Sequence, residues 1–205
     1  MMEERVHSGR AQWPWVVLFV AATVMLLAGG YWHYRSENER IRDEKYQEIA
    51  AIGRLKAGQI EQWRDERIAD ARRSSKAPFF GQALLEWLRN PDNHSIREKL
   101  QDRLLLERKE GGYSDVLILD TEYRIVLSSE PQPHSLSPPA RQAADRALAT
   151  HTSTLSDPYR CPQGFVHLDS VGPVLNSEGQ PIAVLVFRSN ADAVLYPLIQ
   201  SWPTP

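Results

Sequence analysis

The sequence predicts an α+β fold, in which an N-terminal transmembrane helix continues into a long helix and then into a lobe with a roughly five-stranded antiparallel sheet. Two observations indicate the helical part: residues 13–34 of the 205-residue chain contain no Asp, Glu, Lys or Arg, and no proline lies between Trp15 and Lys76. A third observation indicates the sheet, because the residues after Gly112 include short runs rich in β-branched and aromatic side chains.

Composition and charge exclude several classes of protein. With 42% hydrophobic and 24% charged residues, the chain is ordinary globular protein rather than disordered. A formal net charge of −2 removes the electrostatic case for nucleic-acid binding. The single cysteine, Cys161, excludes an intrachain disulfide and any Cys-x-x-Cys site. We therefore expect no nucleic-acid partner, no metal and no cofactor.

Residues 13–34 are predicted to form the transmembrane helix. At about 1.5 Å per residue this segment spans roughly 33 Å, which is enough to cross a hydrocarbon core of about 30 Å. Aromatic side chains lie at both ends, Trp13 and Trp15 at the first and Tyr31 and Trp32 at the second, as is typical of the two membrane interfaces. A core helix of a soluble protein would need only about half this uncharged length.

A cleaved signal peptide and the orientation of the helix are the open questions about this segment. Ala28-Gly29-Gly30 resembles a weak cleavage site, but a signal peptide has a shorter apolar region. Two basic residues precede the helix within 12 residues and four follow it, which taken literally would place the C-terminal side in the cytoplasm. Because this rule applies to short loops, local charge does not settle the topology.

Residues 35–76 are predicted to be a stalk and the long N-terminal helix of the following domain. Both signs of charge mix densely over 35–48, which is typical of a solvated helical face. Apolar residues then recur at near-helical spacing, which predicts one imperfectly buried face. These residues are Ile49, Ile52, Leu55, Ile60, Trp63 and Ile68. A dimeric coiled coil would need stricter heptads.

Residues 77–205 are predicted to form the lobe itself. Helices are expected over 79–88 and 95–109, the second starting with a capping box at Ser95 and ending at Gly111-Gly112, and a helix capped by Ser137 follows later. The strand candidates are 113–120, 123–129, 153–157, 165–176 and 182–189, and an apolar helix follows them. This order favours a PAS-like domain with helices on one face of the sheet; an unrelated small α+β domain is the alternative.

Three segments of the sequence resemble a known family. LKAGQIEQWRDERIADAR at 55–72, SDVLILDTEYRIVLSS at 114–129 and PIAVLVFRSNADAVLYPLIQSWPTP at 181–205 look like the extracytoplasmic Cache sensor region of bacterial transmembrane receptors. The resemblance covers residues 13–205 and is greatest to sensor histidine kinases and related receptors with PAS or GGDEF modules. The amino-acid-binding motif of that family, a Tyr followed by an Arg-x-Trp-Tyr group before the hairpin, has no match here.

The resemblance implies a topology and a division into domains. Residues 1–12 would be cytoplasmic and residues 35–205 would lie outside the cytoplasm, anchored in the bacterial inner membrane by a single pass. Residues 77–205 would be the membrane-distal lobe. The second lobe, second transmembrane helix and output module of such receptors do not follow in this chain, so we expect no enzymatic activity here, although a parent receptor would be a histidine kinase or a diguanylate cyclase.

The sequence contains no GxSxG, HExxH or GxxxxGK[ST] motif, and its six histidines show no metal-ligand spacing. Polar side chains embedded in the apolar strands are better candidates, for binding a small molecule. They are Arg188, His167, Asp169, Asp115, Tyr113 and Tyr159. Strand alternation places Tyr113 and Asp115 on one face of their strand, and it likewise groups His167 with Asp169.

Arg188 is expected to share a face with Val184 and Val186 and would hold a carboxylate through two parallel hydrogen bonds, which suits a small organic acid. The alternative is that Arg188 pairs with Asp169 or Asp115, or that these residues simply face water. The predicted function is a membrane-anchored sensor domain, homodimeric, that binds a small ligand and signals through the transmembrane helix. A dimerisation or partner-binding module on a membrane stalk, without a ligand, is the alternative.

Overall fold

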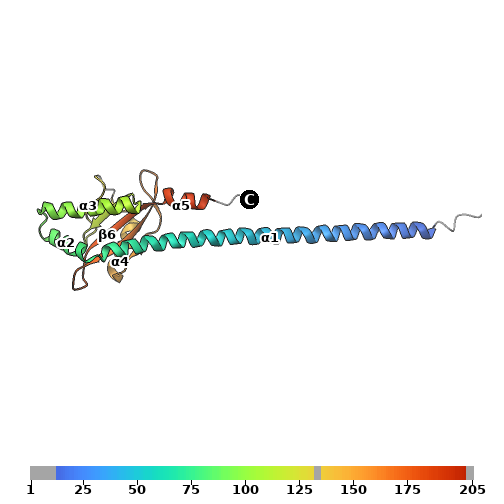
Figure 1. The fold of residues 1–205 in the computed structure, drawn as a ribbon, viewed down its shortest axis with the longest axis horizontal. Coiled ribbons are helices and arrows are strands. Elements are labelled where there is room, and N and C mark those ends of the chain that lie inside the picture. The colour runs from blue at the N-terminus through green and yellow to red at the C-terminus, as the bar shows by residue number, and fades with distance from the viewer. Residues whose placement is uncertain (1–12, 132–134, 202–205) are drawn as a thin grey trace, which may run out of the picture. The chain divides into compact units, whose positions relative to one another are not determined.

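The computed structural model describes residues 13–131 and 135–201 (Figure 1). The chain divides into two compact units between Arg54 and Leu55. A single helix, α1 (Trp13–Ser75), forms the described part of the first unit and continues into the second. The segment predicted to be cytoplasmic, residues 1–12, lies outside the described residues.

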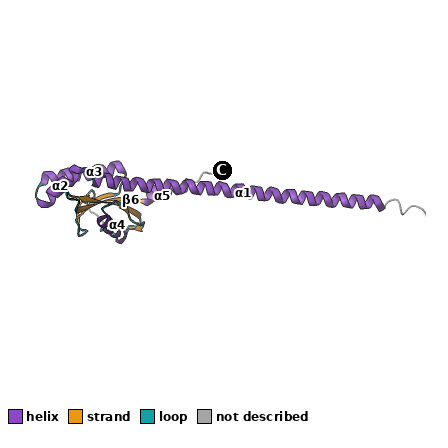
Figure 2. Cartoon of the chain, turned by 90° about the horizontal axis from the view of Figure 1, so that it is seen from below, coloured by secondary structure: helices purple, strands orange, loops and turns teal. Residues whose placement is uncertain are grey.

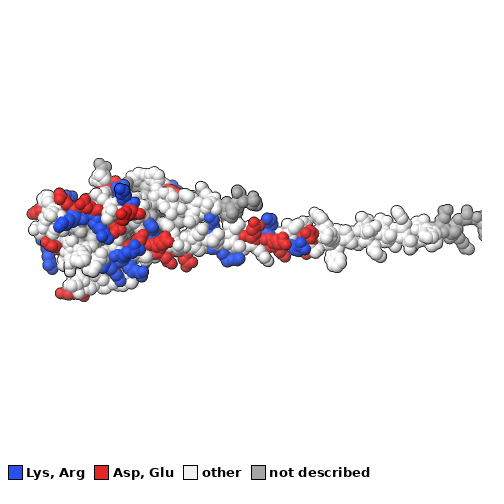
Figure 3. All heavy atoms as spheres, viewed as in Figure 1, with Lys and Arg blue, Asp and Glu red and all other residues white. Residues whose placement is uncertain are grey.

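The first unit contains a helical segment that fits a membrane span. By length and composition the start of α1 is long and apolar enough to cross a membrane. Figure 3 shows this uncharged stretch in white, followed along the same helix by a stretch of mixed charges. In that charged stretch Arg35 pairs with Glu39 at 3.1 Å and Lys45 with Glu48 at 2.8 Å, as expected of a solvated helix.

The second unit is built on one antiparallel sheet. Its strands are β1 (Asp115–Leu119), β2 (Ile125–Ser128), β3 (Thr154–Leu155), β4 (Tyr159–Arg160), β5 (Val166–Leu175) and β6 (Pro181–Asn190). They lie in the order β2-β1-β6-β5-β3, and β4 also pairs with β5. The predicted antiparallel sheet of about five strands is therefore confirmed, and β4 is an addition to the predicted elements.

Helices cover both faces of this sheet, so the expectation of helices on one face is wrong. The last turns of α1, together with α2 (Pro78–Arg89) and α3 (His94–Gly111), lie on one face, and α4 (Pro138–Thr150) lies on the other (Figure 2). The reason is that the central strands are apolar on both sides. In β1, Ile118 packs toward α2 and α3, whereas Leu117 packs toward α4.

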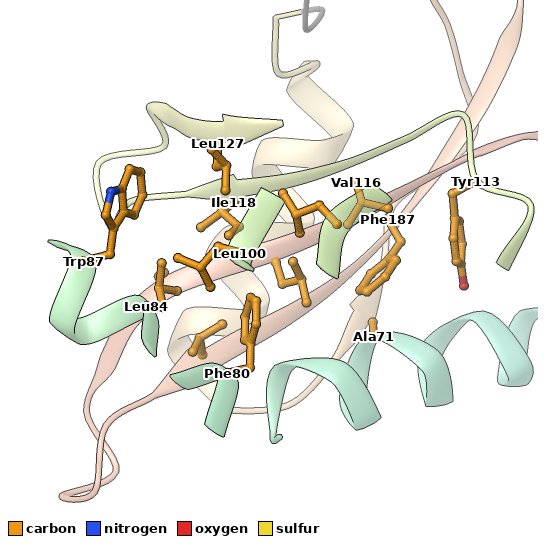
Figure 4. Packing of buried hydrophobic residues seen from close by; sticks show 14 residues of the cluster. Ala71, Phe80, Leu84, Trp87, Leu100, Tyr113, Val116, Ile118, Leu127 and Phe187 are labelled. Carbon is orange, nitrogen blue, oxygen red and sulfur yellow. The ribbon is translucent and has the colours of Figure 1, made fainter. Parts of the chain in front are cut away.

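The larger core lies between the sheet and the three-helix layer. Phe80 and Leu84 of α2 and Leu100 of α3 meet Ile118 and Phe187 of the sheet (Figure 4). The side chains that complete this core are Ala71, Trp87, Leu104, Tyr113, Val116, Leu127, Val174, Ala183 and Leu185.

The helix α1 packs against the backbone of β5 through Gly172. A Cβ atom at Gly172 would lie 2.6 Å from both the carbonyl oxygen of Ala71 and the hydroxyl of Ser75, so the absence of a side chain permits this close approach.

Helix caps agree with the sequence at two positions and differ at one. Ser137 caps α4 by accepting from the amide of Ala140, and Gly112 ends α3 in the left-handed conformation, with φ of 66°. The predicted capping box at Ser95 is wrong. Asn93 accepts from the amide of Ile96 at 3.3 Å instead, and α3 therefore begins one residue before Ser95.

The outer edge of the sheet at β2 is covered by side chains of α3. Gln101 donates from Nε2 to the carbonyl of Ser128 at 2.8 Å, and Arg108 donates from Nη1 to the carbonyl of Ser129 at 3.4 Å. These two carbonyl groups, at and just after the C-terminal end of the edge strand, therefore already have hydrogen-bond partners.

A candidate ligand pocket at one end of the sheet

A cavity of about 240 Å³ lies at the end of the sheet where β1 and β5 begin and β2 and β6 finish. Its walls are Ser114, Asp115, Glu130, Cys161, Gln163, Phe165, His167, Arg188 and Asn190. Three of the predicted binding residues, Asp115, His167 and Arg188, therefore line one cavity. Two larger hollows, of about 530 and 470 Å³, are lined by no buried charged side chain among the described residues.

The register of the sheet brings three charged residues side by side. Arg188 of β6 lies directly opposite Asp115 of β1 on one side and Asp169 of β5 on the other. Directly opposed residues on adjacent strands point to the same face, which here is the face covered by α4. The predicted grouping of Arg188 with Val184 and Val186 agrees with this placement.

Arg188 is already paired. Its Nε lies 3.3 Å from Oδ1 of Asp169 and its Nη2 lies 3.4 Å from Oδ2, and Asp169 is completely buried. Tyr159 donates from its hydroxyl to Oδ2 of Asp169 at 2.9 Å. Burial raises the pKa of the Asp169 carboxyl, and the neighbouring Arg188 acts in the opposite direction without cancelling that effect. The pairing of Arg188 with Asp169, which the sequence leaves open as the alternative, is thus present.

Asp115 is held by neutral donors instead of by a cation. Its Oδ1 accepts from the hydroxyls of Ser129 at 2.7 Å and Ser128 at 3.0 Å and from the amide of Glu130 at 3.2 Å. Within residues 13–131 and 135–201, no basic side chain forms a salt bridge with this carboxylate. Glu130, by contrast, forms a salt bridge with Arg108. Arg188 and Arg108 are thus each paired with another carboxylate, whereas Asp115 forms no salt bridge among the described residues.

Two predicted binding residues are tyrosines: Tyr159 lies next to the pocket, and Tyr113 lies on the opposite face of the sheet. The ring of Tyr159 lies 5.9 Å from that of His167, a pocket residue, and its hydroxyl donates to Asp169, the partner of Arg188. Burial and the charge of Asp169 raise the pKa of Tyr159, which keeps its hydroxyl protonated as a donor.

Tyr113 does not belong to the pocket, and its predicted placement on the face of Asp115 is wrong. Its ring packs 4.9 Å from that of Phe187 in the core under the helices, and its hydroxyl donates to Asp70 of α1 at 2.7 Å (Figure 4). The strand begins only at Asp115, so the alternation of strand side chains does not extend to Tyr113.

Glu130 and Asn190 are among the polar pocket residues that were not candidates from the sequence. Glu130 follows the Ser-Ser pair that binds Asp115, and the proximity of that pair to the start of β1 is a property of the hairpin register. Asn190 ends β6 and caps the next helix, which is visible in the sequence only as an Asn before an apolar helical run.

No protein-family model and no curated protein matches the sequence. Solved structures do match. The ligand-binding domain of the Campylobacter jejuni chemoreceptor Tlp3, in complex with L-norvaline, is 15% identical with a TM-score of 0.58, over 74% of this chain and 60% of that one. The domain of the Pseudomonas aeruginosa PAO1 amino acid chemoreceptor PctC, in complex with GABA, is 19% identical with a TM-score of 0.54, over 73% and 66%.

A third neighbour is the domain of the Pseudomonas fluorescens chemoreceptor CtaA in complex with L-serine, which is 16% identical with a TM-score of 0.54, over 76% of this chain and 63% of that one. All three are Cache-type extracytoplasmic sensor domains. The chain has the Cache fold. It spans about 60% of the Tlp3 domain, and at this level of identity the likeness establishes the architecture alone.

The Cache fold agrees with the resemblance that the sequence shows to Cache sensor regions. The neighbours are sensory domains and not enzymes. In the part of the chain that the structure describes, no group of three His, Cys, Asp or Glu residues is arranged to hold a metal ion.

Proposed function

We propose that this chain is the membrane-anchored, extracytoplasmic input domain of a bacterial signal-transduction receptor, and that it binds a small ligand in the cavity beside Asp115 and Arg188. The observation that supports this most directly is the row of buried charges in a Cache fold, two of which, Asp115 and Arg188, line a cavity. In this proposal residues 13–34 anchor the chain, residues 35–76 form the stalk and long helix, and residues 77–205 form the ligand-binding lobe. The receptor acts as a homodimer and signals through the membrane helix.

The charge balance of the pocket favours a ligand with an ammonium group. Arg188 shares its charge with Asp169, whereas Asp115 faces Arg188 from the other side and forms no salt bridge with a basic side chain among the described residues. A cationic ligand group would form a charge-assisted hydrogen bond with Asp115. A bare organic acid, the ligand expected from the sequence, would have to compete with Asp169 for the guanidinium group.

The ligands of the solved neighbours are compatible with this class. L-norvaline, GABA and L-serine, which those domains bind, all carry both an ammonium group and a carboxylate. In this chain a carboxylate on the ligand would accept a hydrogen bond from Nη1 of Arg188, which donates to no acceptor among the described residues. A cavity of about 240 Å³ suits a molecule smaller than a typical drug.

The ligand class is tested with three compounds that share a three-carbon skeleton: propylamine, propionate and β-alanine. We expect propylamine and β-alanine to raise the melting temperature of the full chain in detergent micelles, and propionate to leave it unchanged, because only the first two carry an ammonium group. Titration calorimetry then gives the affinities. If propionate alone binds, the ammonium proposal is wrong while a ligand-binding role stands.

Asp115→Asn removes the negative charge with little change of shape, and we expect it to weaken propylamine binding about tenfold or more, the loss of one charge-assisted hydrogen bond. Asp120→Asn, the same substitution just beyond the other end of β1, is the matched control and should leave the affinity unchanged. If no compound binds to the wild type and a broader set of amines, acids and sugars also fails, the partner-binding alternative takes the place of sensing.

The topology is tested separately. A reporter enzyme that is active only outside the cytoplasm, fused after Pro205, is expected to be active, because residues 35–205 are proposed to be extracytoplasmic. An inactive reporter, with the fusion present in the membrane fraction, would place the domain in the cytoplasm.

A further inference from the structure

The helix α5 (Ala191–Gln200) begins at the pocket, because its N-cap residue lies in the pocket wall. Asn190 lines the cavity, and its Oδ1 accepts from the amides of Asp192 at 2.9 Å and Ala193 at 3.3 Å. The same side chain is therefore part of the pocket wall and the N-cap of α5. Asp192 adds a second contact, because its carboxylate accepts from the amide of Val166 at the start of β5 at 2.8 Å.

The other end of α5 is held by α1. Nζ of Lys56 donates to the carbonyl of Leu198 at 2.8 Å and to the hydroxyl of Ser201, the C-cap residue, at 2.8 Å. The C-terminal end of a helix carries partial negative charge and unpaired carbonyl groups, so an ammonium group is favourable there. Lys56 thus stabilises the C-terminal end of α5, as Asn190 stabilises its N-terminal end.

Between these two ends α5 has few other stabilising contacts. Of its ten residues, all of which the structure describes, only Ala191 is buried. Pro197 lies inside the helix and cannot donate the hydrogen bond to the carbonyl of Ala193. Because a helix of this length is marginal without tertiary contacts, α5 depends on both of its ends. Loss of the stabilising contact at one end of α5 is therefore expected to weaken the contact at the other end.

We propose that α5 couples the pocket to α1, with the cap at Asn190 and the contact at Lys56 stabilising one helical state of α5. The inference rests on the proposed sensor function, since it assigns the route by which ligand binding in the pocket affects α1. A ligand that hydrogen-bonds to Asn190 changes the strength of the cap and hence how firmly Lys56 is held. The size of this effect is set by how much better the ligand binds one state of α5 than the other.

The coupling is measured without any ligand, from the rate at which the Lys56 amine of the full chain is acetylated by an N-hydroxysuccinimide ester. Mass spectrometry reads this rate residue by residue. Asn190→Ala removes the cap, and because loss of an N-cap shifts a helical equilibrium about fivefold, we expect Lys56 to react about fivefold faster. Asn190→Asp keeps an acceptor oxygen at the cap and should react at the wild-type rate.

Asn93→Ala is the matched control, because it removes the same residue type from the N-cap of α3, which has no hydrogen bond to Lys56 among the described residues. It should leave the acetylation of Lys56 unchanged. Equal acceleration in Asn93→Ala and Asn190→Ala would overturn the proposal, since it would reflect general loosening of the domain.

Amide hydrogen exchange in α5 completes the test. In Asn190→Ala we expect faster exchange along the whole helix. Faster exchange confined to the first turn, with unchanged acetylation of Lys56, would contradict the coupling, and so would unchanged exchange throughout α5. None of these measurements depends on propylamine or β-alanine binding, so failure of the ligand proposal and failure of the coupling are distinguishable.

Discussion

Arg188 and Asp169 form a buried cross-strand ion pair, with Nε of the arginine 3.3 Å from Oδ1 of the aspartate and neither residue more than 3% exposed. Removing one partner from such a pair leaves the other charge buried and uncompensated. We expect Arg188→Ala to lower the free energy of unfolding by about 3–5 kcal/mol, measured by urea unfolding of the full chain in micelles.

The double variant Arg188→Ala with Asp169→Ala separates this charge effect from lost packing. Since no unpaired charge is left, we expect it to be more stable than Arg188→Ala alone. If the double variant is destabilised relative to the wild type by the sum of the two single effects, the two side chains do not interact. Binding tests on Arg188→Ala therefore require a folded control, because loss of binding alone does not assign Arg188 to the ligand.

Tyr113 lies in the core on one face of the sheet, whereas Tyr159 lies next to the pocket on the other face. Tyr113→Phe removes the hydrogen bond to Asp70 and is expected to cost about 1–2 kcal/mol of stability while leaving the affinity for β-alanine unchanged. Tyr159→Phe removes a donor to Asp169, next to the pocket, and should alter that affinity. Calorimetric titration of both variants decides the matter. A weakened affinity in Tyr113→Phe alone would place the site on the face of the sheet covered by α1, α2 and α3.

Two glycines of the second unit are expected to respond to alanine in opposite directions. At Gly172 the added Cβ would meet the Ala71 carbonyl at 2.6 Å, so we expect Gly172→Ala to destabilise the domain by about 1–3 kcal/mol. At Gly58, inside α1, nothing lies within 4 Å of the added atom, and Gly58→Ala should stabilise the helix by up to about 1 kcal/mol. Urea unfolding compares the two. A neutral Gly172→Ala would show that α1 does not pack closely on β5.

Asp120, in the turn between β1 and β2, makes the stability of the domain depend on pH. Partial burial works against its charged form, but the amides of Arg124 and Glu122 and the Arg124 guanidinium hold its pKa below the ordinary value. Because the folded pKa is lower than the unfolded one, the stabilisation is present above pH of about 4 and is lost as the pH falls through the folded pKa.

Asp120→Asn keeps the acceptor oxygen for the two amides but loses the charge. The stability difference between wild type and Asp120→Asn, taken from urea unfolding, should be largest near neutral pH and shrink as the solution is acidified. A difference that stays constant with pH would show that the carboxylate is not stabilised in its ionised form.

The sheet and the three charged residues at its pocket end could be predicted from the sequence, because strand alternation has a fixed period. Asp115, Asp169 and Arg188 each lie within a predicted strand that is otherwise largely apolar, and the structure places all three on one face. The same reasoning fails for Tyr113, since it assumes that the strand starts two residues earlier than it does. Where a strand begins depends on the turn before it, here the left-handed Gly112, and not on periodicity.

Other features depend on contacts between segments far apart in the chain. Glu130 reaches the pocket through the hairpin register, and Lys56 meets α5 across more than a hundred residues of sequence. The pairing of Arg188 with Asp169 rather than Asp115 is likewise decided by side-chain geometry, because both aspartates lie opposite Arg188 in the sheet. Local patterns indicated the candidates, and only the tertiary structure distinguishes their roles.

The protected carbonyls of β2 have a consequence for self-association. An unpaired sheet edge is a template for another strand, and proteins that expose a long flat edge tend to aggregate. Here Gln101 and Arg108 occupy carbonyl groups at the end of β2, while β3 and β4, on the opposite side, are only two residues long. Copies of this domain are therefore not expected to merge their sheets into a continuous one through these edges.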